Sequence, residues 1–293
     1  MESAKIKALI NLLDDPDEMI YNQVREAIIN EGNDIIPLLE ESWENIDHGS
    51  LYRSRLEELV HTIQFTNTAK SLQNWIDSPN KDLLEGAIII ARYQYPELDI
   101  KHIYTEIEKL KKAIWIEINE YQTAYEKIRI FNKVFYGKLG FRGAGSDYYS
   151  PFNSYINTVL ESRKGNPLSL SLIYSILAQQ LNMPIYGVNL PNHFIVAYLD
   201  SDDILRHFSE EEHYGVLFYI NAYSKGAIFD RNEIDDYLKN LDKEPERSFY
   251  EPCSNSTIIN RMITNLVIAY EQEGKTEKAD ELRKLRQLFD LKI

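Results

Sequence analysis

Residues 131–198 read FNKVFYGKLGFRGAGSDYYSPFNSYINTVLESRKGNPLSLSLIYSILAQQLNMPIYGVNLPNHFIVAY. Within this stretch, Gly165-Asn166-Pro167 signals the start of a helix, because Asn is a favoured N-cap and Pro is tolerated at the first helical position. The apolar-rich run that follows predicts a buried helix, which ends at Asn182-Met183-Pro184. Two strand-like segments come next, with Asn192-His193 between them. This order of elements decides the fold class.

The same order of elements resembles the core of the transglutaminase-like (papain-like) fold. More narrowly, the stretch resembles the SirB-type transglutaminase-like family in the short patterns Asn153-Ser154-Tyr155, Val159-Leu160, Gly165-x-Pro167-x-Ser169-Leu170 and Pro191-x-His193-Phe194. The resemblance covers about residues 125–285. It implies a nucleophile at the start of the buried helix and a histidine on a following strand.

The position of the nucleophile is where this chain departs from the fold family. Counting back from the helix end at Asn182-Met183-Pro184 places the family's cysteine at Pro167. Proline keeps the helix start and removes the thiol. Cys253, the single cysteine of the chain, lies outside the motif. Ser169 and Ser171 could serve as nucleophiles, or they could cap and pack the helix, which is the commoner use of serine near a helix start.

The other catalytic candidates are His193 and Asn221. His193 matches the family's histidine, although a buried structural histidine remains an alternative. Asn221 ends the predicted strand Val216–Ile220, at the position where the family usually has an aspartate, and asparagine can also orient an imidazole. These two residues form a degenerate triad whose nucleophile position is Pro167. The candidate binding residues are Asn166, Ser169, Asn192 and Tyr149.

The composition indicates a soluble chain. The 293 residues are 44% hydrophobic and 27% charged, with a formal net charge of −14. This negative balance argues against nucleic-acid binding and against an anionic membrane surface. No apolar run approaches the ~20 residues of a membrane helix. The N-terminus lacks a cleavage signature, and one cysteine fits a reducing compartment. We therefore expect a cytoplasmic protein with no cofactor and with an unknown protein or peptide as its partner.

The flanking regions are predicted to be helical. Residues 1–102 form short helices with breaks at Asp14–Asp17, Gly32-Asn33, Gly49-Ser50, Ser78–Asn80 and Tyr95-Pro96, and they are either HEAT-like repeats or a helical region that covers the core. Residues 103–240 form the core, which begins with the longest helical candidate, 103–136, broken near 114–121. Residues 241–293 form a tail in which Gly274 and Ala279 resemble the turn of a tetratricopeptide repeat.

His207 and His213, with Glu210 to Glu212 between them, could form a metal site, but exposed loop charge is the commoner reason for such a run. We expect no metal.

The fold class is therefore α+β: N-terminal helices, a transglutaminase-like core with a small antiparallel sheet, and a helical tail. The expected function is that of a pseudoenzyme that binds a peptide or protein. The alternatives are a hydrolase or acyl transferase that uses His193 and Asn221 with a serine or water, and a purely structural domain.

Overall fold

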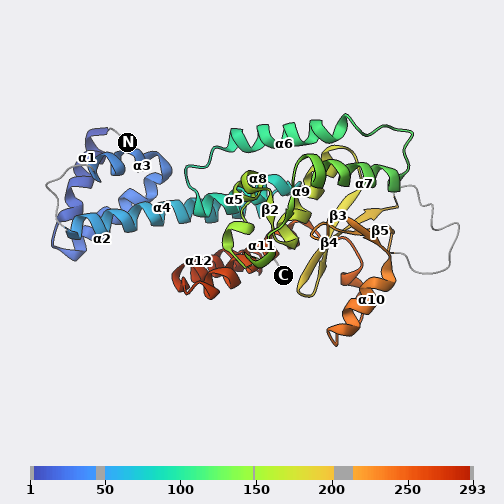
Figure 1. The fold of residues 1–293 in the computed structure, drawn as a ribbon. Coiled ribbons are helices and arrows are strands. Elements are labelled where there is room, and N and C mark those ends of the chain that lie inside the picture. The colour runs from blue at the N-terminus through green and yellow to red at the C-terminus, as the bar shows by residue number, and fades with distance from the viewer. Residues whose placement is uncertain (1–2, 44–49, 148, 201–213, 291–293) are drawn as a thin grey trace. The chain divides into compact units, whose positions relative to one another are not determined.

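A computed structural model describes residues 3–43, 50–147, 149–200 and 214–290. The chain divides into two compact units, one made of Met1–Asn74 with Arg92–Pro96 and the other of Trp75–Ala91 with Glu97–Ile293. Both units are drawn in Figure 1. The boundaries at 102 and 240 stay a prediction.

The first unit is helical. It contains α1 (Ser3–Asn11), α2 (Glu18–Glu31), α3 (Ile36–Trp43) and most of α4 (Ser50–Asp77). Apolar side chains spaced three and four residues apart meet in one core, which is the pattern of amphipathic helices. The buried residues are Ile10, Leu13, Tyr21, Val24, Ile28, Ile35, Ile36, Leu39, Tyr52, Leu56, Leu59 and Ile63. The predicted repeat character of this region stays a prediction.

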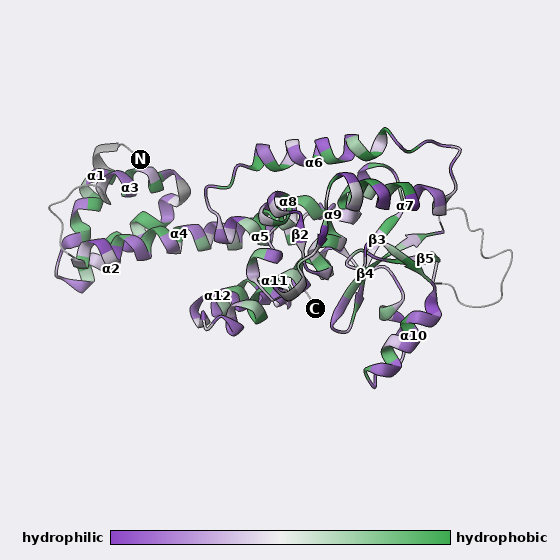
Figure 2. Cartoon of the chain, in the orientation of Figure 1, coloured by the Kyte–Doolittle hydropathy of each residue, from purple (hydrophilic) through white to green (hydrophobic). Residues whose placement is uncertain are grey.

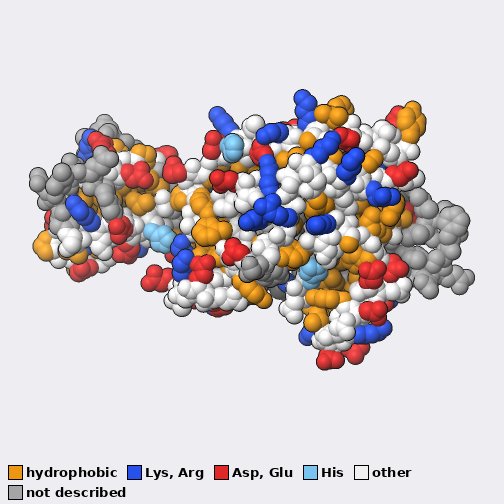
Figure 3. All heavy atoms as spheres, in the orientation of Figure 1, with side chains coloured by type: hydrophobic (Ala, Val, Ile, Leu, Met, Phe, Trp, Pro, Cys, Tyr) orange, Lys and Arg blue, Asp and Glu red, His pale blue; other side chains and the backbone are white. Residues whose placement is uncertain are grey.

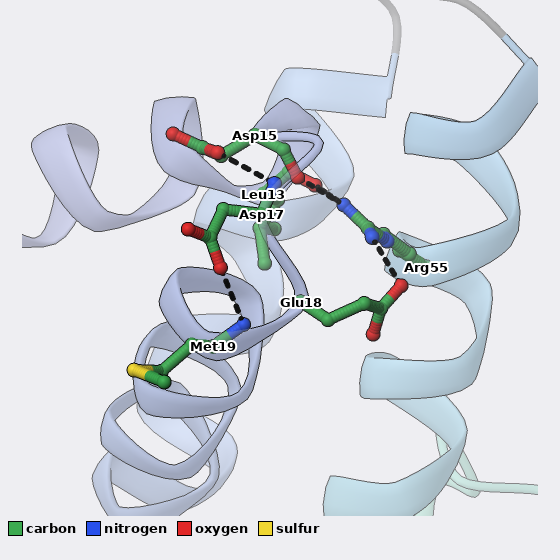
Figure 4. Close-up of polar contacts among 6 residues, drawn as sticks. All are labelled: Leu13, Asp15, Asp17, Glu18, Met19 and Arg55. Atoms are coloured by element: carbon green, nitrogen blue, oxygen red, sulfur yellow. Dashed lines mark hydrogen bonds and ion pairs between the residues drawn. The ribbon is translucent and has the colours of Figure 1, made fainter.

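Arg55 joins α4 to the connection between α1 and α2 (Figure 4). Its side chain is buried, and Nη1 donates to the carbonyl oxygens of Leu13 at 2.9 Å and Asp15 at 2.8 Å. Its Nη2 donates to Glu18 Oε1 at 3.2 Å. The buried guanidinium therefore has partners, as a buried charge requires. Asp17 caps α2 by accepting a hydrogen bond from the Met19 N–H, which confirms the predicted break at Asp14–Asp17.

Helix α4 differs from the prediction. Residues 103–136 were predicted to hold the longest helix, but α4 runs from Ser50 to Asp77 and, at 28 residues, is longer than any helix within 103–136. Thr68, Leu72, Trp75 and Ile76 are buried and continue the helical spacing. Polar neighbours obscured this periodicity, and no Pro or Gly interrupts the chain before Ser78.

The second unit combines helices with two small sheets. Its elements are most of α5 (Leu83–Gln94), together with α6 (Ile100–Trp115), α7 (Ala124–Asn132), β1 (Arg142–Gly143), α8 (Ile156–Ser162), β2 (Lys164–Gly165), α9 (Pro167–Gln180), β3 (Ile185–Leu190), β4 (His193–Leu199), β5 (Val216–Asn221), β6 (Ala227–Phe229), α10 (Arg231–Asn240), α11 (Asn255–Gln272) and α12 (Thr276–Gln287). No helix in the described part of the chain has the length and apolar character needed to cross a membrane.

The larger sheet has the strand order β3-β4-β5-β6, and every neighbouring pair is antiparallel. Helix α9 packs against β3 and β4 (Figure 1). All its residues from Pro167 to Ala178 are buried, as expected for a helix that is hydrophobic on all sides. Helix α10 adds Ile234 and Leu238 to a cluster formed by the sheet and Tyr250.

Helices α6 and α7 confirm the predicted break in 103–136. Helix α6 ends at Trp115, and Thr123 starts α7 with a capping box to Glu126. Figure 2 shows hydrophobic and hydrophilic residues alternating along α6. Its buried residues are Ile103, Ile107, Leu110 and Ile114, so one stripe of the helix faces the core.

One pairing brings a distant segment to the start of α9. Strand β1 pairs in parallel with β2 immediately before α9. Strand β6, which the sequence analysis did not predict, adds an edge to the main sheet. Helices α11 and α12 pack together around the turn at Gly274, while their relation to tetratricopeptide repeats stays a prediction.

Candidate functional site

The start of α9 is a closed network of hydrogen bonds. Asn166 is the N-cap, and Pro167 occupies the first turn, which confirms both sequence predictions. Asn166 Oδ1 accepts from the Ser169 N–H at 2.9 Å, and Ser169 Oγ accepts from the Asn166 N–H at 3.0 Å. This reciprocal pair is a capping box, which satisfies two otherwise unpaired N–H groups. Asn166 Nδ2 also donates to Ser154 Oγ at 2.9 Å.

The two serines considered as nucleophiles are both buried. Ser169 Oγ donates to the Asn153 carbonyl at 2.6 Å, and its side chain packs so closely that a Cβ at Gly165 would lie 2.5 Å from this oxygen. Ser171 is fully buried, and its hydroxyl donates to the Phe194 carbonyl at 3.5 Å. Each hydroxyl therefore takes part in the packing of α9.

His193 is the first residue of β4 and follows Asn192, whose φ of 57° turns the chain between β3 and β4. The pKa of His193 lies below its ordinary value. Burial of the ring lowers the pKa most, and the charge of Arg261 lowers it further, while a side-chain hydrogen bond with Asn221 acts in the opposite direction. Its surroundings therefore favour the neutral imidazole. The predicted His193–Asn221 pair is present in the structure as a contact.

Asn221 ends β5 and also shapes the turn after it. Its Oδ1 accepts from the backbone N–H groups of Tyr223 and Ser224, at 3.1 Å in each case. An asparagine side chain fixed by its own turn holds its amide at a constant position beside the imidazole. Asn221 is suited to orient His193.

A cavity of about 200 Å³ opens where α9, the β3–β4 turn and α11 meet. Its lining consists of Tyr149, Ser150, Ser154, Asn166, Pro167, Leu168, Asn192, His193, Phe194, Arg261, Asn265, Ile268 and Ala269. The structure thus brings together Tyr149, Asn166, Asn192 and His193 with Pro167, the predicted nucleophile position. Ser169 and Asn221 are not part of the lining. The first turn of α9 directs the positive end of its backbone dipole toward this space.

The contribution of α11 to the cavity was not predicted from the sequence. Arg261, Asn265, Ile268 and Ala269 form one wall of the cavity. Their spacing of four, three and one residues places them on one face of the helix. These residues fall in the predicted tail, 241–293, which was placed outside the core, so they were not among the predicted site residues.

Cys253 lies apart from this cavity. Its N–H donates to the Gly187 carbonyl at 2.8 Å, which holds the segment before α11 against β3. Burial raises the pKa of the Cys253 thiol to about 12. The thiolate, which is the reactive form, is therefore scarce at neutral pH.

The possible metal cluster of His207, His213 and Glu210 to Glu212 lies outside the described residues. Within the parts of the chain that the structure describes, no group of three or more His, Cys, Asp and Glu side chains is placed to hold a metal ion.

Comparisons with known proteins agree with this architecture. The profile of the transglutaminase-like superfamily matches residues 101–264. A UPF0162 protein of Xylella fastidiosa is 28% identical over 210 residues, which is 70% of this chain and 70% of that protein. A UPF0162 protein of Vibrio cholerae is 28% identical over 197 residues, covering 66% of this chain and 68% of that protein.

The human F-box only protein 21 is 24% identical over 259 residues, which is 80% of this chain and 40% of that protein. No solved structure gives a significant match. The matched region begins in α6 and ends in α11, includes α9 and the β3–β4 turn, and spans more than half of the chain. The chain therefore belongs to the transglutaminase-like superfamily.

Proposed function

We propose that this protein is a non-catalytic member of its superfamily and that the cavity at the start of α9 binds a peptide or a segment of a protein. The observation that carries this proposal is the identity of the residue at the start of α9. Pro167, which we align with the family's cysteine, lines the cavity next to His193 and has no nucleophilic atom.

The hydroxyl groups around the cavity favour binding over catalysis. Ser169 and Ser171 lie outside the lining. Of the two serines in the lining, Ser150 and Ser154, the second is 5% exposed and accepts a hydrogen bond from Asn166. Among the described residues, His193 makes its side-chain hydrogen bond with Asn221 and none with a serine hydroxyl. Activation of a serine requires a base within hydrogen-bond reach of its hydroxyl. The lining instead offers amide groups beside apolar side chains, a mixture that suits a ligand-binding cavity.

Affinity selection from a pooled library of synthetic peptides tests the binding proposal. Ile268 lines the cavity and is 42% exposed, so Ile268→Trp should narrow the cavity with little effect on folding. Ile116→Trp is the matched control, because Ile116 is 66% exposed and is not part of the lining. Wild type and Ile116→Trp should retain the same peptides, and Ile268→Trp should lose them. Retention of the same peptides by Ile268→Trp would contradict the proposal.

The hydrolase or acyl transferase alternative has support from the contact between His193 and Asn221, which matches a base with its orienting residue. Ester and amide substrates can be assayed with wild type, His193→Ala and Asn221→Ala. Turnover by wild type that falls by about a hundredfold or more in His193→Ala, within the usual contribution of a general base, would establish the alternative. We expect no turnover above that of the buffer.

A further inference from the structure

The lining of the cavity carries a positive charge, whereas the chain as a whole is negative. The sequence contains 46 Asp and Glu residues against 32 Lys and Arg residues. Among the described residues that line the cavity, none is acidic, and Arg261 is the one with a permanent charge. Figure 3 shows that basic side chains also gather over α6 and α8, so the negative charge of the chain is unevenly spread. The cavity is therefore suited to an anionic group.

Arg261 is held beside His193. Its Nη1 donates to Asn189 Oδ1 at 3.3 Å, which ties the guanidinium of α11 to strand β3. The charge of Arg261 lowers the pKa of His193 and of Tyr237, so both rings lie within its electrostatic reach. A guanidinium in a fixed position can bind a carboxylate through two parallel hydrogen bonds.

The rest of the lining sets the size and polarity of the ligand. Leu168, Phe194, Ile268 and Ala269 supply apolar surface, and the amides of Asn192 and Asn265 supply donors and acceptors. A volume of about 200 Å³ is smaller than that of a usual drug-sized pocket, which starts at about 300 Å³. The cavity has room for about one amino-acid residue.

We infer that the cavity receives the C-terminal residue of a peptide or protein, with the free α-carboxylate at Arg261 and an aliphatic side chain against Ile268. A chain end combines an anion, an amide and an apolar side chain within one residue, which matches the lining group by group. Capture of a terminal carboxylate is an established mode of peptide recognition. This inference rests on the proposed binding function and names the part of the ligand that is recognised.

Three acetylated tetrapeptides of equal length test the inference by isothermal titration: Ac-Gly-Ser-Ala-Val with a free carboxylate, the same peptide with a C-terminal carboxamide, and Ac-Gly-Glu-Ala-Val-carboxamide. The free acid should bind at least about tenfold more tightly than the carboxamide, since a hydrogen bond to a charged group contributes about 1.5–3 kcal/mol. The third peptide carries its carboxylate on a side chain, and it should bind no better than the second.

Two substitutions at one exposed position isolate the charge. Ile268→Glu adds an anion at the cavity, and Ile268→Gln is its uncharged match in shape. Ile268→Glu should weaken binding of the free acid by about fivefold or more relative to Ile268→Gln, and less so at high salt. The two variants should bind the carboxamide equally. Arg261→Gln should remove the preference for the free acid.

The outcomes separate the inference from the function on which it rests. Equal binding of free acid and carboxamide would overturn the chain-end inference and leave peptide binding intact, and so would tighter binding of the side-chain carboxylate. If none of the three tetrapeptides binds, but the pooled library still yields peptides that wild type retains and Ile268→Trp loses, the chain-end inference is overturned. If the library yields no such peptides either, the proposed function is overturned.

Discussion

Three serines of the buried helix α9 provide a controlled test of how the structure accounts for stability. Ser169, Ser171 and Ser175 are at most 5% exposed, so the change to alanine has the same chemistry and nearly the same burial in each case. Their hydroxyl groups differ in their partners. Ser169 Oγ makes bonds of 2.6 Å and 3.0 Å, Ser171 Oγ makes one long bond of 3.5 Å, and Ser175 Oγ is buried without a hydrogen-bond partner in the described structure.

The expected changes in the free energy of unfolding follow from these partners. Alanine gains roughly 0.5 kcal/mol over serine in helix propensity at each position. Ser169→Ala loses two buried hydrogen bonds at about 1 kcal/mol each, so it should destabilise the protein by about 1–2 kcal/mol. Ser171→Ala loses one weak bond and should lie within about 0.5 kcal/mol of wild type. Ser175→Ala removes a buried unpaired hydroxyl, so it should stabilise by about 1–2 kcal/mol.

Urea unfolding measures these values. In a Trp43→Phe background, the fluorescence comes from Trp75 and Trp115, which both lie in the compact unit that contains α9. The m-value should stay constant across the series, so that shifts of the midpoint report stability. The reasoning is refuted if Ser175→Ala destabilises as much as Ser169→Ala, because the order depends on the partners of the hydroxyl groups alone.

Three further predictions concern other positions. Gly226→Ala should cost about 2–3 kcal/mol in thermal unfolding, because its φ is 72° and a Cβ would lie 2.1 Å from Asn132 Oδ1; a stability equal to wild type would contradict this. The pKa of His193 is lowered, so its contribution to stability is complete above pH 6.5 and is lost as the pH falls through the lower folded value; an NMR titration that places this pKa above 6.5 would reverse the sign. Pro167→Cys combined with Asn221→Asp should create a thiol with a pKa below ~8.5 at the start of α9. It should alkylate faster than Cys253, whose pKa is raised to about 12, and equal rates would show that Pro167 is misaligned with the nucleophile.

Local signals were sufficient for the start of α9 and the elements after it. Asn166 and Pro167 have strong positional preferences, so the cap and the first turn could be predicted from neighbouring residues alone. The turn at Asn192 and the strand that begins with His193 also follow from local sequence. The contact between His193 and Asn221 could be predicted because the family resemblance supplied the pairing of their strands.

The wall formed by α11 could not be predicted in the same way. Arg261 lies 68 positions after His193 in the sequence, and its place beside the cavity depends on how α11 packs against the core. Helical periodicity shows that Arg261 and Asn265 share a face, but it does not show what that face contacts. The length of α4 was missed for a different reason, since buried Thr68 gave no apolar signal.

The polar groups at the start of α9 already have hydrogen-bond partners within the protein. We therefore expect the residues that stabilise this part of the fold to differ from those that bind a ligand in the cavity. A catalytic nucleophile needs a reactive atom that is exposed to its substrate, and such groups usually reduce stability. Here Asn166, Ser169 and Ser154 are hydrogen-bonded to one another or to the backbone, and Pro167 has no N–H to satisfy. Replacements in this network should therefore change the free energy of unfolding, whereas replacements of Arg261 should change ligand affinity. A rigid helix start beside a cationic wall is an arrangement suited to holding a ligand, since little side-chain freedom remains to be lost on binding.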